Sequence, residues 1–567
     1  TADKDFHRSV TNGTIGRNLS LINENLLSYN FTVKNDHNFD FLLGLSFQKD
    51  QTYNNKGSAQ GGPNDFVHYA KGEWGEGNGL INNNKESDRE TNPEWGSAFE
   101  YESSLEEERM NSYFGRLRYN YKEKYMFETT LRRDGSSVFG EDVRWATFPS
   151  VAVGWVFSDE SFLKNLYWLS FGKLRVSWGR SGQKFSQRYL AHGLMGNTGG
   201  SFFGQAGMGP DMDGGLLNRK LSWEKTDQYD FGLDISLFDY RVKLTCDYYY
   251  RYTKGQLQRM DLGGDLNYQY FQWQNALGVS NEGIEMELTV DILRESAVSW
   301  RAKLNASRNW NRFEKSNDGY DFDNNIIGKS LYNIRTYKTD GFYNSMDEVP
   351  YYYQSNSRPQ PLSGSRIEDI FFPGTRRLVD LNGDGRITES DKYYAASPLP
   401  LAHGGFANEL RWKRFDLNIF FVYSLGRHIL KLYDDRSLNV DPGEMRPMFV
   451  DVNRINAWTG PNSKNPDYPR LISYDLNDQF TGNYDCDIEN VNMLRLKQLT
   501  LGYNLHERFA KKIGLSGARV FLTAENLFLL TNYSGPEPEI VNITEGVDLL
   551  SGYPLPRKFT IGLTINF

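Results

Sequence analysis

The chain ends in the stretch Lys558-Phe559-Thr560-Ile561-Gly562-Leu563-Thr564-Ile565-Asn566-Phe567, and this stretch decides the fold. Its odd positions are all apolar, whereas the even positions after Lys558 are Thr, Gly, Thr and Asn. A period of two predicts a β-strand with one apolar and one polar face. An apolar face of about five residues that closes on a terminal Phe has the length of a strand that crosses an outer membrane. A soluble β-sandwich is compatible with the same pattern, so the interpretation depends on whether it recurs upstream.

The alternation recurs along most of the chain and predicts an all-β protein. In residues 39–47 and 231–237 every odd position is again apolar. We expect strands at 25–35, 39–47, 112–121, 126–133, 147–157, 171–179, 231–237, 242–251, 284–292, 300–310, 332–342, 406–412, 415–423, 494–503, 519–527 and 558–567. In 494–503 the apolar positions change from even to odd, which predicts a β-bulge near Lys497 and Gln498.

Two consecutive strands carry opposite charges on their polar faces. Residues 284–292 place Glu285, Glu287 and Asp291 on one side, and 300–310 place Arg301 and Lys303 on the corresponding side. We expect these strands to be neighbours that line a wet lumen while their apolar residues face lipid. An exposed sheet face of a soluble protein is the alternative.

Composition excludes several classes of protein. The chain has 567 residues without a linker-like break, which favours one large repetitive architecture over several domains. It has no apolar run long enough for a transmembrane helix, and its 15% aromatic content suits a barrel with aromatic girdles. A net charge of −8 gives no support for a nucleic-acid surface. The two cysteines, Cys246 and Cys486, are too few for a disulfide framework.

The lengths of the connections indicate which side of a membrane each one occupies. Short turns near Lys122, Asp239, Arg294, Lys413 and Lys511 alternate with long loops near 50–106, 181–221, 254–281, 346–400, 430–490 and 531–557. Outer-membrane barrels have short periplasmic turns and long external loops. If short turns and long loops are to alternate between the two sides, a second strand besides 332–342 must lie between Trp310 and Phe406, at 366–372 or 376–380. The chain would then contain about 17 strands. Because bacterial barrels have even strand numbers, we expect residues 1–567 to be the C-terminal part of a larger barrel.

One loop carries a metal-binding motif. Residues 380–391 match the pattern D-x-N-x-D-G-x-I, with Asp380, Asn382 and Asp384 at loop positions 1, 3 and 5. Arg386 would supply a carbonyl at position 7, and Asp391 stands at position 12, where a Glu is usual. We expect a structural calcium ion that stiffens an external loop. The alternative is a polar turn with solvated carboxylates.

No residue pattern predicts an enzyme. The sequence lacks H-E-x-x-H and G-x-S-x-G, and its seven histidines are scattered singly. Gly328-Lys329-Ser330 resembles the end of a phosphate-binding loop, but Asp323 replaces its first glycine. Clusters of aromatic residues in expected loops make Tyr352 and Trp273 candidates for stacking on sugar rings.

Several stretches of the C-terminal third resemble a known family. They are Asp380-Leu-Asn-Gly-Asp-Gly-Arg-Ile, then Pro398-Leu-Pro-Leu-Ala-His-Gly-Gly-Phe, then Asn492-Met-Leu-Arg-Leu-Lys-Gln-Leu-Thr-Leu-Gly-Tyr, then Thr523-Ala-Glu-Asn-Leu-Phe-Leu-Leu-Thr-Asn-Tyr-Ser-Gly-Pro-Glu-Pro-Glu539, and finally Tyr553-Pro-Leu-Pro-Arg557 leading to Phe567. In this order they are similar to the SusC-like TonB-dependent outer-membrane transporters of Bacteroidetes. Lys338-Thr-Asp-Gly-Phe342 extends the resemblance upstream.

The resemblance implies a 22-stranded barrel in the outer membrane of a Gram-negative cell, filled by an N-terminal plug and energised by TonB. It also implies a SusD-like surface lipoprotein that closes over the mouth as a lid. The sequence contains no plug and no TonB-binding segment, so TonB dependence would reside in residues outside it. The resemblance therefore predicts an importer of oligosaccharides that makes and breaks no bond. Oligopeptide import, a passive porin and a secreted β-rich carbohydrate-binding protein are the alternatives.

Overall fold

The structure is a computed structural model. It describes residues 9–62, 98–186, 188–193, 195–202, 205–210, 215–262, 271–294, 296–322, 325–349, 351–353, 359–361, 373–384, 387–431, 456–470, 484–512, 514–542, 545–549 and 552–567.

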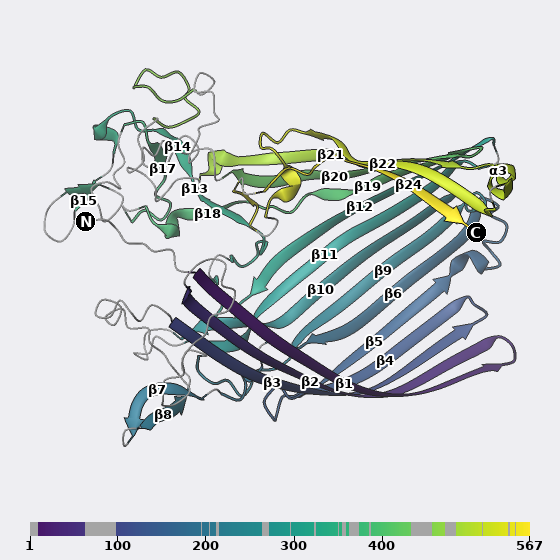
Figure 1. The fold of residues 1–567 in the computed structure, drawn as a ribbon, viewed down its shortest axis with the longest axis horizontal. Helices are drawn as coiled ribbons and strands as arrows, with labels where there is room; N and C mark the ends of the chain where they lie inside the picture. Colours follow the sequence, from purple (N-terminus) through teal and green to yellow (C-terminus); the bar gives the residue numbers. More distant parts are fainter. Residues whose placement is uncertain are drawn as a thin grey trace. The chain divides into compact units, whose positions relative to one another are not determined.

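Strands dominate these residues (Figure 1). They are β1 (Ser9–Val33), β2 (His37–Gly62), β3 (Ala98–Tyr121), β4 (Tyr125–Ser136), β5 (Trp145–Val156), β6 (Leu169–Gln183), β7 (Met195–Phe202), β8 (Gln205–Pro210), β9 (Glu224–Leu237), β10 (Val242–Asp261), β11 (Phe271–Leu293), β12 (Val298–Lys315), β13 (Ile334–Tyr337), β14 (Thr339–Phe342), β15 (Tyr351–Tyr353), β16 (Pro359–Pro361), β17 (Arg376–Leu378), β18 (Lys392–Ala396), β19 (Ala402–Trp412), β20 (Phe415–Lys431), β21 (Ile488–Asn504), β22 (Gly517–Thr531), β23 (Val547–Asp548) and β24 (Lys558–Asn566). Helical segments are short: α3 (Glu507–Lys512) and single 3-10 turns at Phe157–Asp159, Met346–Glu348, Glu389–Asp391, Asp485–Asp487 and Pro538–Ile540.

One 16-stranded sheet contains the long strands. Its order is β1-β2-β3-β4-β5-β6-β9-β10-β11-β12-β19-β20-β21-β22-β24, so each long strand pairs with the next long strand in the chain. The pairs β1-β2, β2-β3, β3-β4, β11-β12, β12-β19, β19-β20, β20-β21, β21-β22 and β22-β24 are antiparallel, whereas β23, the sixteenth strand, joins β20 in parallel. The pairs β7-β8, β13-β18, β14-β17 and β15-β16 form small separate sheets. The all-β antiparallel prediction is confirmed.

The two strands expected between Trp310 and Phe406 do not belong to the main sheet. β12 pairs directly with β19, from Val298 opposite Trp412 to Ser307 opposite His403. Residues 332–342 instead form β13 and β14, with four residues each. A membrane-crossing strand needs about 9–11 residues, so these strands are too short to cross. Of the two proposed partners, 376–380 contributes β17, and 366–372 lies outside the described residues.

The terminal strand has the two faces that its sequence predicts. The side chains of Phe559, Ile561 and Leu563 are 66%, 80% and 60% exposed. Ile561 lies opposite Leu522 of β22, which in turn lies opposite Leu501 of β21. Directly opposed residues share a face, so these strands present a continuous apolar surface.

The predicted bulge is present. Phe420 of β20 lies opposite Gln498, and Phe421 lies opposite Leu496, so the pairing passes over Lys497. The register against β22 also shifts between Leu496 and Gln498. The extra residue lets both halves of β21 keep their apolar side chains on one face.

Tight turns join several pairs of neighbouring strands. Phe238, Asp239 and Tyr240 have φ values of 52°, 55° and 61°, and Lys122 and Glu123 have φ values of 53° and 56°. Positive φ in short hairpin connections matches the twist of the flanking strands. The short connections predicted at Lys122 and Asp239 are therefore confirmed, and α3 occupies the one near Lys511.

Several expected loops are partly strand. β2 continues to Gly62 and β3 begins at Ala98, so the loop expected at 50–106 was placed too wide. β10 and β11 likewise extend into 254–281, and β7 and β8 lie within 181–221. These extensions lack an apolar alternation because they hold polar residues on both faces.

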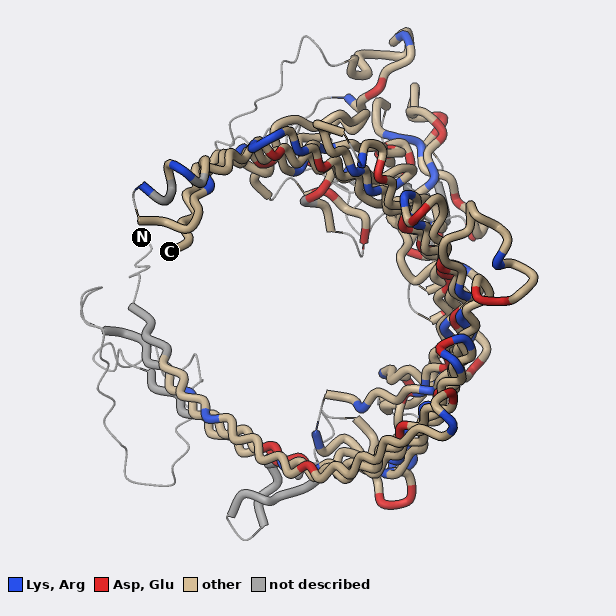
Figure 2. Tube along the Cα trace, turned by 90° about the vertical axis from the view of Figure 1, so that its right-hand side faces the viewer, with Lys and Arg blue, Asp and Glu red and all other residues tan. Residues whose placement is uncertain are grey.

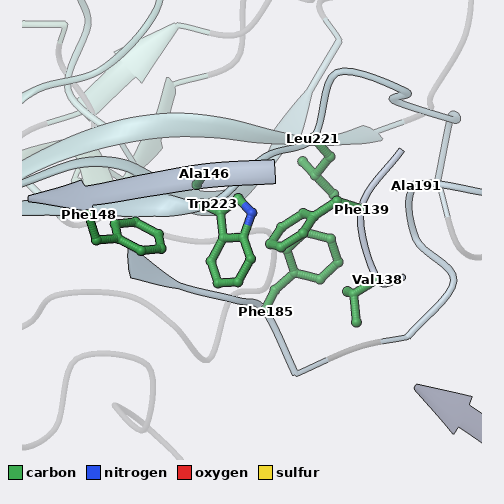
Figure 3. Close-up of a cluster of buried hydrophobic side chains, with 8 residues drawn as sticks. All are labelled: Val138, Phe139, Ala146, Phe148, Phe185, Ala191, Leu221 and Trp223. Atoms are coloured by element: carbon green, nitrogen blue, oxygen red, sulfur yellow. The ribbon is translucent and has the colours of Figure 1, made fainter. Parts of the chain in front are cut away.

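The chain divides into two compact units. One consists of Thr1–Ala152, Gly179–Asp227 and Lys254–Ala276, and the other of Val153–Trp178, Gln228–Thr253 and Leu277–Phe567. The first unit has a core of eight buried side chains, shown in Figure 3: Val138, Phe139, Ala146, Phe148, Phe185, Ala191, Leu221 and Trp223. The rings of Phe139 and Trp223 have centroids 4.6 Å apart, and the Trp223 indole Nε1 donates to the Arg144 carbonyl at 3.0 Å. Full burial of such an apolar side chain contributes about 1.5–3 kcal/mol to stability.

Cys246 and Cys486 are both free thiols, as the small number of cysteines predicts. Among the residues that the structure describes, no helix is long and apolar enough to cross a membrane.

Candidate functional site

The polar face of the second unit is built from ion pairs between adjacent strands. Asp291 lies opposite Arg301, whose Nε donates to the Asp291 carboxylate at 2.5 Å. Lys303 reaches across the other side of β12 and donates to Glu409 of β19 at 2.6 Å. The prediction that the acidic and basic strands are neighbours is confirmed. Figure 2 shows acidic and basic residues interleaved along the traces.

Further ion pairs continue this polar face. Arg175 of β6 bridges Asp234 of β9 and Asp247 of β10, at 2.8 Å to each carboxylate. Arg519 of β22 donates to Asp416 of β20 at 2.5 Å. These pairs are partly exposed, so each contributes about 0–1 kcal/mol to stability. Their consequence is a wall dense in hydrogen-bonding groups.

Two carboxylates on this wall differ from the rest. Glu285 and Glu287 on β11 are exposed, and they have no ion-pair or hydrogen-bond partner among the residues the structure describes. Their cross-strand neighbours on β12 are Ser307 and Asn305, which carry no charge. Towards β12, this part of the polar face therefore presents negative charge that no ion pair compensates.

A segment that we call the strap is fastened to the same face, and consists of the described residues 532–542, 545–549 and 552–557 between β22 and β24. Arg495 of β21 is only 3% exposed and forms ion pairs with Glu537 and with Glu539, the latter at 2.8 Å. Lys497 also binds Glu539, at 3.0 Å. Removing one partner of a buried pair leaves a buried charge, which costs about 3–5 kcal/mol.

Further apolar and polar contacts hold the strap against the sheet. Tyr533 packs in a buried cluster with Ile429, Val491 and Val541, and its hydroxyl donates to Asp548 at 2.5 Å. The alternation of apolar and polar residues did not predict the strap. The available signal was the run Pro536-Glu-Pro-Glu539 in a loop, facing a strand whose polar positions include Arg495 and Lys497.

The residues predicted to bind calcium form a closed polar turn. Asp380 accepts from the Gly383 N–H at 2.7 Å, and Asn382 accepts from the Asp384 N–H at 2.8 Å. Asp391 is fully buried and accepts from the backbone N–H groups of Leu381 and Thr388 at 3.0 and 2.7 Å. Both Asp391 oxygens are thus engaged by the loop itself. Arg386 lies outside the described residues.

No group of three or more acidic, His or Cys side chains in metal-binding geometry occurs within the described part of the chain. The other described side chains of the predicted ligand set, Asp380, Asn382 and Asp384, belong to one short segment, and each of them makes a hydrogen bond within the turn. A calcium site there stays a prediction, with Asp391 as a hydrogen-bond acceptor in the conformation that the structure shows.

This turn rests on a small buried core in the second unit. Ile387 packs with Tyr337, Tyr343, Val349, Leu378 and Tyr484. Burial raises the pKa of Tyr343 to about 12, and burial, together with Glu389, raises the pKa of Tyr337. Asp485 accepts from the Thr339 hydroxyl at 2.6 Å and from the Tyr393 hydroxyl at 3.1 Å, which fastens β14 and β18 to the same core.

The two aromatic residues predicted to stack on sugar rings lie in different strands. Trp273 lies in β11, not in a loop, and packs against the core of the first unit. Its ring is 6.4 Å from that of Phe271 at an interplanar angle of 83°. Tyr352 lies in β15, and its side chain is outside the part that the structure describes. Their roles in substrate binding stay predictions.

Comparisons with known proteins give one consistent family. A family model described as "TonB dependent receptor-like, beta-barrel" matches residues 2–393. TonB-dependent receptor P3 of Formosa agariphila is 33% identical over 570 residues, which cover 96% of this chain and 52% of that protein. TonB-dependent receptor SusC of Bacteroides thetaiotaomicron is 29% identical over 469 residues, which cover 80% and 43%.

A solved structure is similar over nearly the whole chain. The RagAB peptide importer in its "open-open" state matches with a TM-score of 0.75 and 22% identity, over 98% of this chain and 55% of that chain. At this identity the similarity shows the fold. The chain spans about half the length of the curated relatives it matches.

Proposed function

Because this chain belongs to the TonB dependent receptor-like β-barrel family of the outer membrane, whose members are transporters and receptors and not enzymes, we propose that it forms a wall of a SusC-type nutrient importer. The resemblance seen in the sequence, the outer-membrane location and the absence of an enzymatic role are confirmed at the level of the family. Importing activity, substrate and partners are proposals for this chain.

The observation that carries the proposal is the two-sided sheet. One face exposes Ile561, Leu563 and Leu522 to lipid, while the other presents the ion pairs around Arg175, Arg301 and Arg519. Strands of outer-membrane barrels alternate in this way between lipid and a wet interior. The polar face would line the path of the substrate.

The two edge strands of the sheet support a proposal about the architecture of the whole barrel. β1 and β24 stand at the two ends of the strand order, and among the described residues each pairs with one neighbouring strand. Unpaired strand edges are not tolerated in lipid. We therefore propose that residues 1–567 are the C-terminal part of a larger barrel whose other strands cover both edges. A plug and a TonB-binding segment would belong to that remainder.

We propose neutral oligosaccharides as the substrate. Hydroxyl-rich sugars suit a wall dense in hydrogen-bonding side chains, and exposed Glu285 and Glu287 repel polyanions such as sulfated glycans. A SusD-like lipoprotein would capture the sugar and close over the loops. The small core around Tyr343 would give such a partner an ordered surface.

We propose a structural role for calcium. Asp380, Asn382 and Asp384 would hold it in the turn above Ile387, where its charge would rigidify the loop. No transport step depends on it.

Uptake by living cells tests the function. Cells with and without the protein are given fluorescent neutral oligosaccharides, sulfated oligosaccharides or oligopeptides, each with and without a protonophore. We expect uptake of neutral oligosaccharides only, lost without the protein and stopped by the protonophore. Uptake that persists with the protonophore would indicate a passive channel, and uptake of peptides alone would refute the choice of substrate.

A variant pair sharpens the substrate test. Glu285→Gln with Glu287→Gln removes the uncompensated charge from β11, and should raise uptake of sulfated relative to neutral oligosaccharides. The matched control is Thr289→Val on the same face of β11, opposite Lys303, which changes no charge.

A further inference from the structure

A groove lies on the apolar face of the sheet, away from the substrate path. Its volume is about 450 Å³, and it is lined by Tyr423, Leu425, Asn492, Met493, Leu494, Leu530, Thr531 and Asn532. Tyr423, Leu494 and Leu530 stand opposite one another on β20, β21 and β22 and so share a face. Leu530 and Leu425 are 59% and 44% exposed, whereas Ile429 and Val491 on the other face are buried beneath the strap.

A local irregularity makes the groove. Between Ser424 and Arg427 the register of β20 against β21 shifts, so that Leu425 and Gly426 stand beside the single residue Asn492. Gly426 has a φ of 66°, a conformation that favours glycine. The shift takes the Gly426 N–H out of the ladder, and the Asn492 side-chain oxygen accepts from it at 2.8 Å.

The amide of Asn492 is oriented by this bond. Because its oxygen is held by Gly426, its NH₂ group is the part left to donate to a ligand. Asn532 fixes the backbone beside it, since the Asn492 N–H donates to the Asn532 side-chain oxygen at 2.7 Å and the Asn532 amide donates to the Asn490 carbonyl at 2.8 Å. The polar rim is therefore rigid.

The apolar and polar side chains of the groove are distributed as a bound lipid would require. Leu425, Leu494 and Leu530 give an apolar floor, and Asn492, Thr531 and Asn532 give a polar rim where β22 ends. The floor is continuous with the lipid-facing surface, through the pairing of β21 and β22 and of β22 and β24. This arrangement matches an acyl chain whose carbonyl lies at the rim.

We propose that the groove holds one acyl chain of an outer-leaflet lipid, whose ester or amide carbonyl accepts a hydrogen bond from the Asn492 side chain. The lipid is retained at this place, in contrast to the exchanging lipids around it. The inference rests on the outer-membrane location of the family and not on the transported substrate.

Native mass spectrometry tests the proposal on the protein extracted from its own outer membrane in mild detergent. Wild type should retain one lipid per protein after extended washing. Leu530→Trp fills the groove and should lower this retention about tenfold. The control is Leu563→Trp, which adds the same ring at an equally exposed position of β24 outside the groove, and should retain the lipid.

A second variant keeps the test valid if Leu530→Trp fails to fold. Asn492→Asp keeps the oxygen that accepts from Gly426 but removes the donor, so retention should again fall about tenfold. Equal retention in wild type and both groove variants would overturn the proposal. So would equal loss in Leu563→Trp, or loss of a co-purifying lipoprotein with no loss of free lipid, which would assign the groove to a protein's acyl anchor.

Discussion

Replacing Arg495 by methionine should release the strap. The guanidinium of Arg495 is 3% exposed and holds Glu537, which is 6% exposed, and Glu539, which is 18% exposed. Methionine keeps much of the side-chain volume but leaves Glu537 without its cation. Breaking a buried pair in this way costs about 3–5 kcal/mol. Lys497 still neutralises Glu539, so we expect the lower end of this range.

Hydrogen exchange measured by mass spectrometry reads out this local opening. A loss of about 3 kcal/mol raises the exchange of protected amides in the strap by about a hundredfold, because each 1.36 kcal/mol is a factor of ten. Arg519→Met is the matched control, since it breaks the ion pair with Asp416 on the same face and does not touch the strap. Adding Glu537→Gln to Arg495→Met should restore part of the protection, because the orphaned charge is removed. Unchanged exchange of the strap in Arg495→Met would refute the reasoning.

Three further changes have defined outcomes. Ile561→Lys places a charge at a lipid-facing position that is 80% exposed and should cost about 2–4 kcal/mol in unfolding from lipid vesicles, whereas Thr560→Lys on the polar face should cost less; equal costs would contradict the assignment of the faces. Burial raises the pKa of Tyr343 from 10.0 to about 12, so the stability it contributes is complete below pH 10 and is lost as pH rises towards 12. Tyrosinate absorbance should therefore include a group that titrates near pH 12 in wild type and is missing in Tyr343→Phe, and identical titrations would exclude the shift. After dialysis, metal analysis should find calcium in wild type and less in Asp384→Ala, and negligible calcium in both would exclude the metal site.

Much of the sheet was predictable because its apolar alternation is local. The terminal strand, the turns at Lys122 and Asp239 and the bulge at Lys497 all follow from patterns within about ten residues. The bulge was visible because lipid demands an apolar residue at every second position, so a change of parity has to be corrected by an extra residue.

The features that the sequence did not predict lack such a local pattern. β2 and β3 run on past Phe47 and before Ser112 with polar residues on both faces, so nothing in their sequence marks them as strands. β13 and β14 show an apolar pattern, but their partners are the distant β18 and β17. The strap depends on the contact of Arg495 with Glu537, two residues 42 positions apart, which no periodicity reveals.

Lys497 also shows how the wall absorbs a change in chain length. Deleting this one residue would leave Leu494-Arg495-Leu496-Gln498-Leu499, in which apolar and polar residues alternate strictly, so Gln498 and Leu496 would keep their partners Phe420 and Phe421 in a regular ladder. Arg495 would stay on the polar face and Leu494 on the lipid-facing side, and the strap would lose only the ion pair between Lys497 and Glu539. The length of β21 can therefore change by one residue at this position, whereas deleting Thr500 would turn Leu499 onto the polar face.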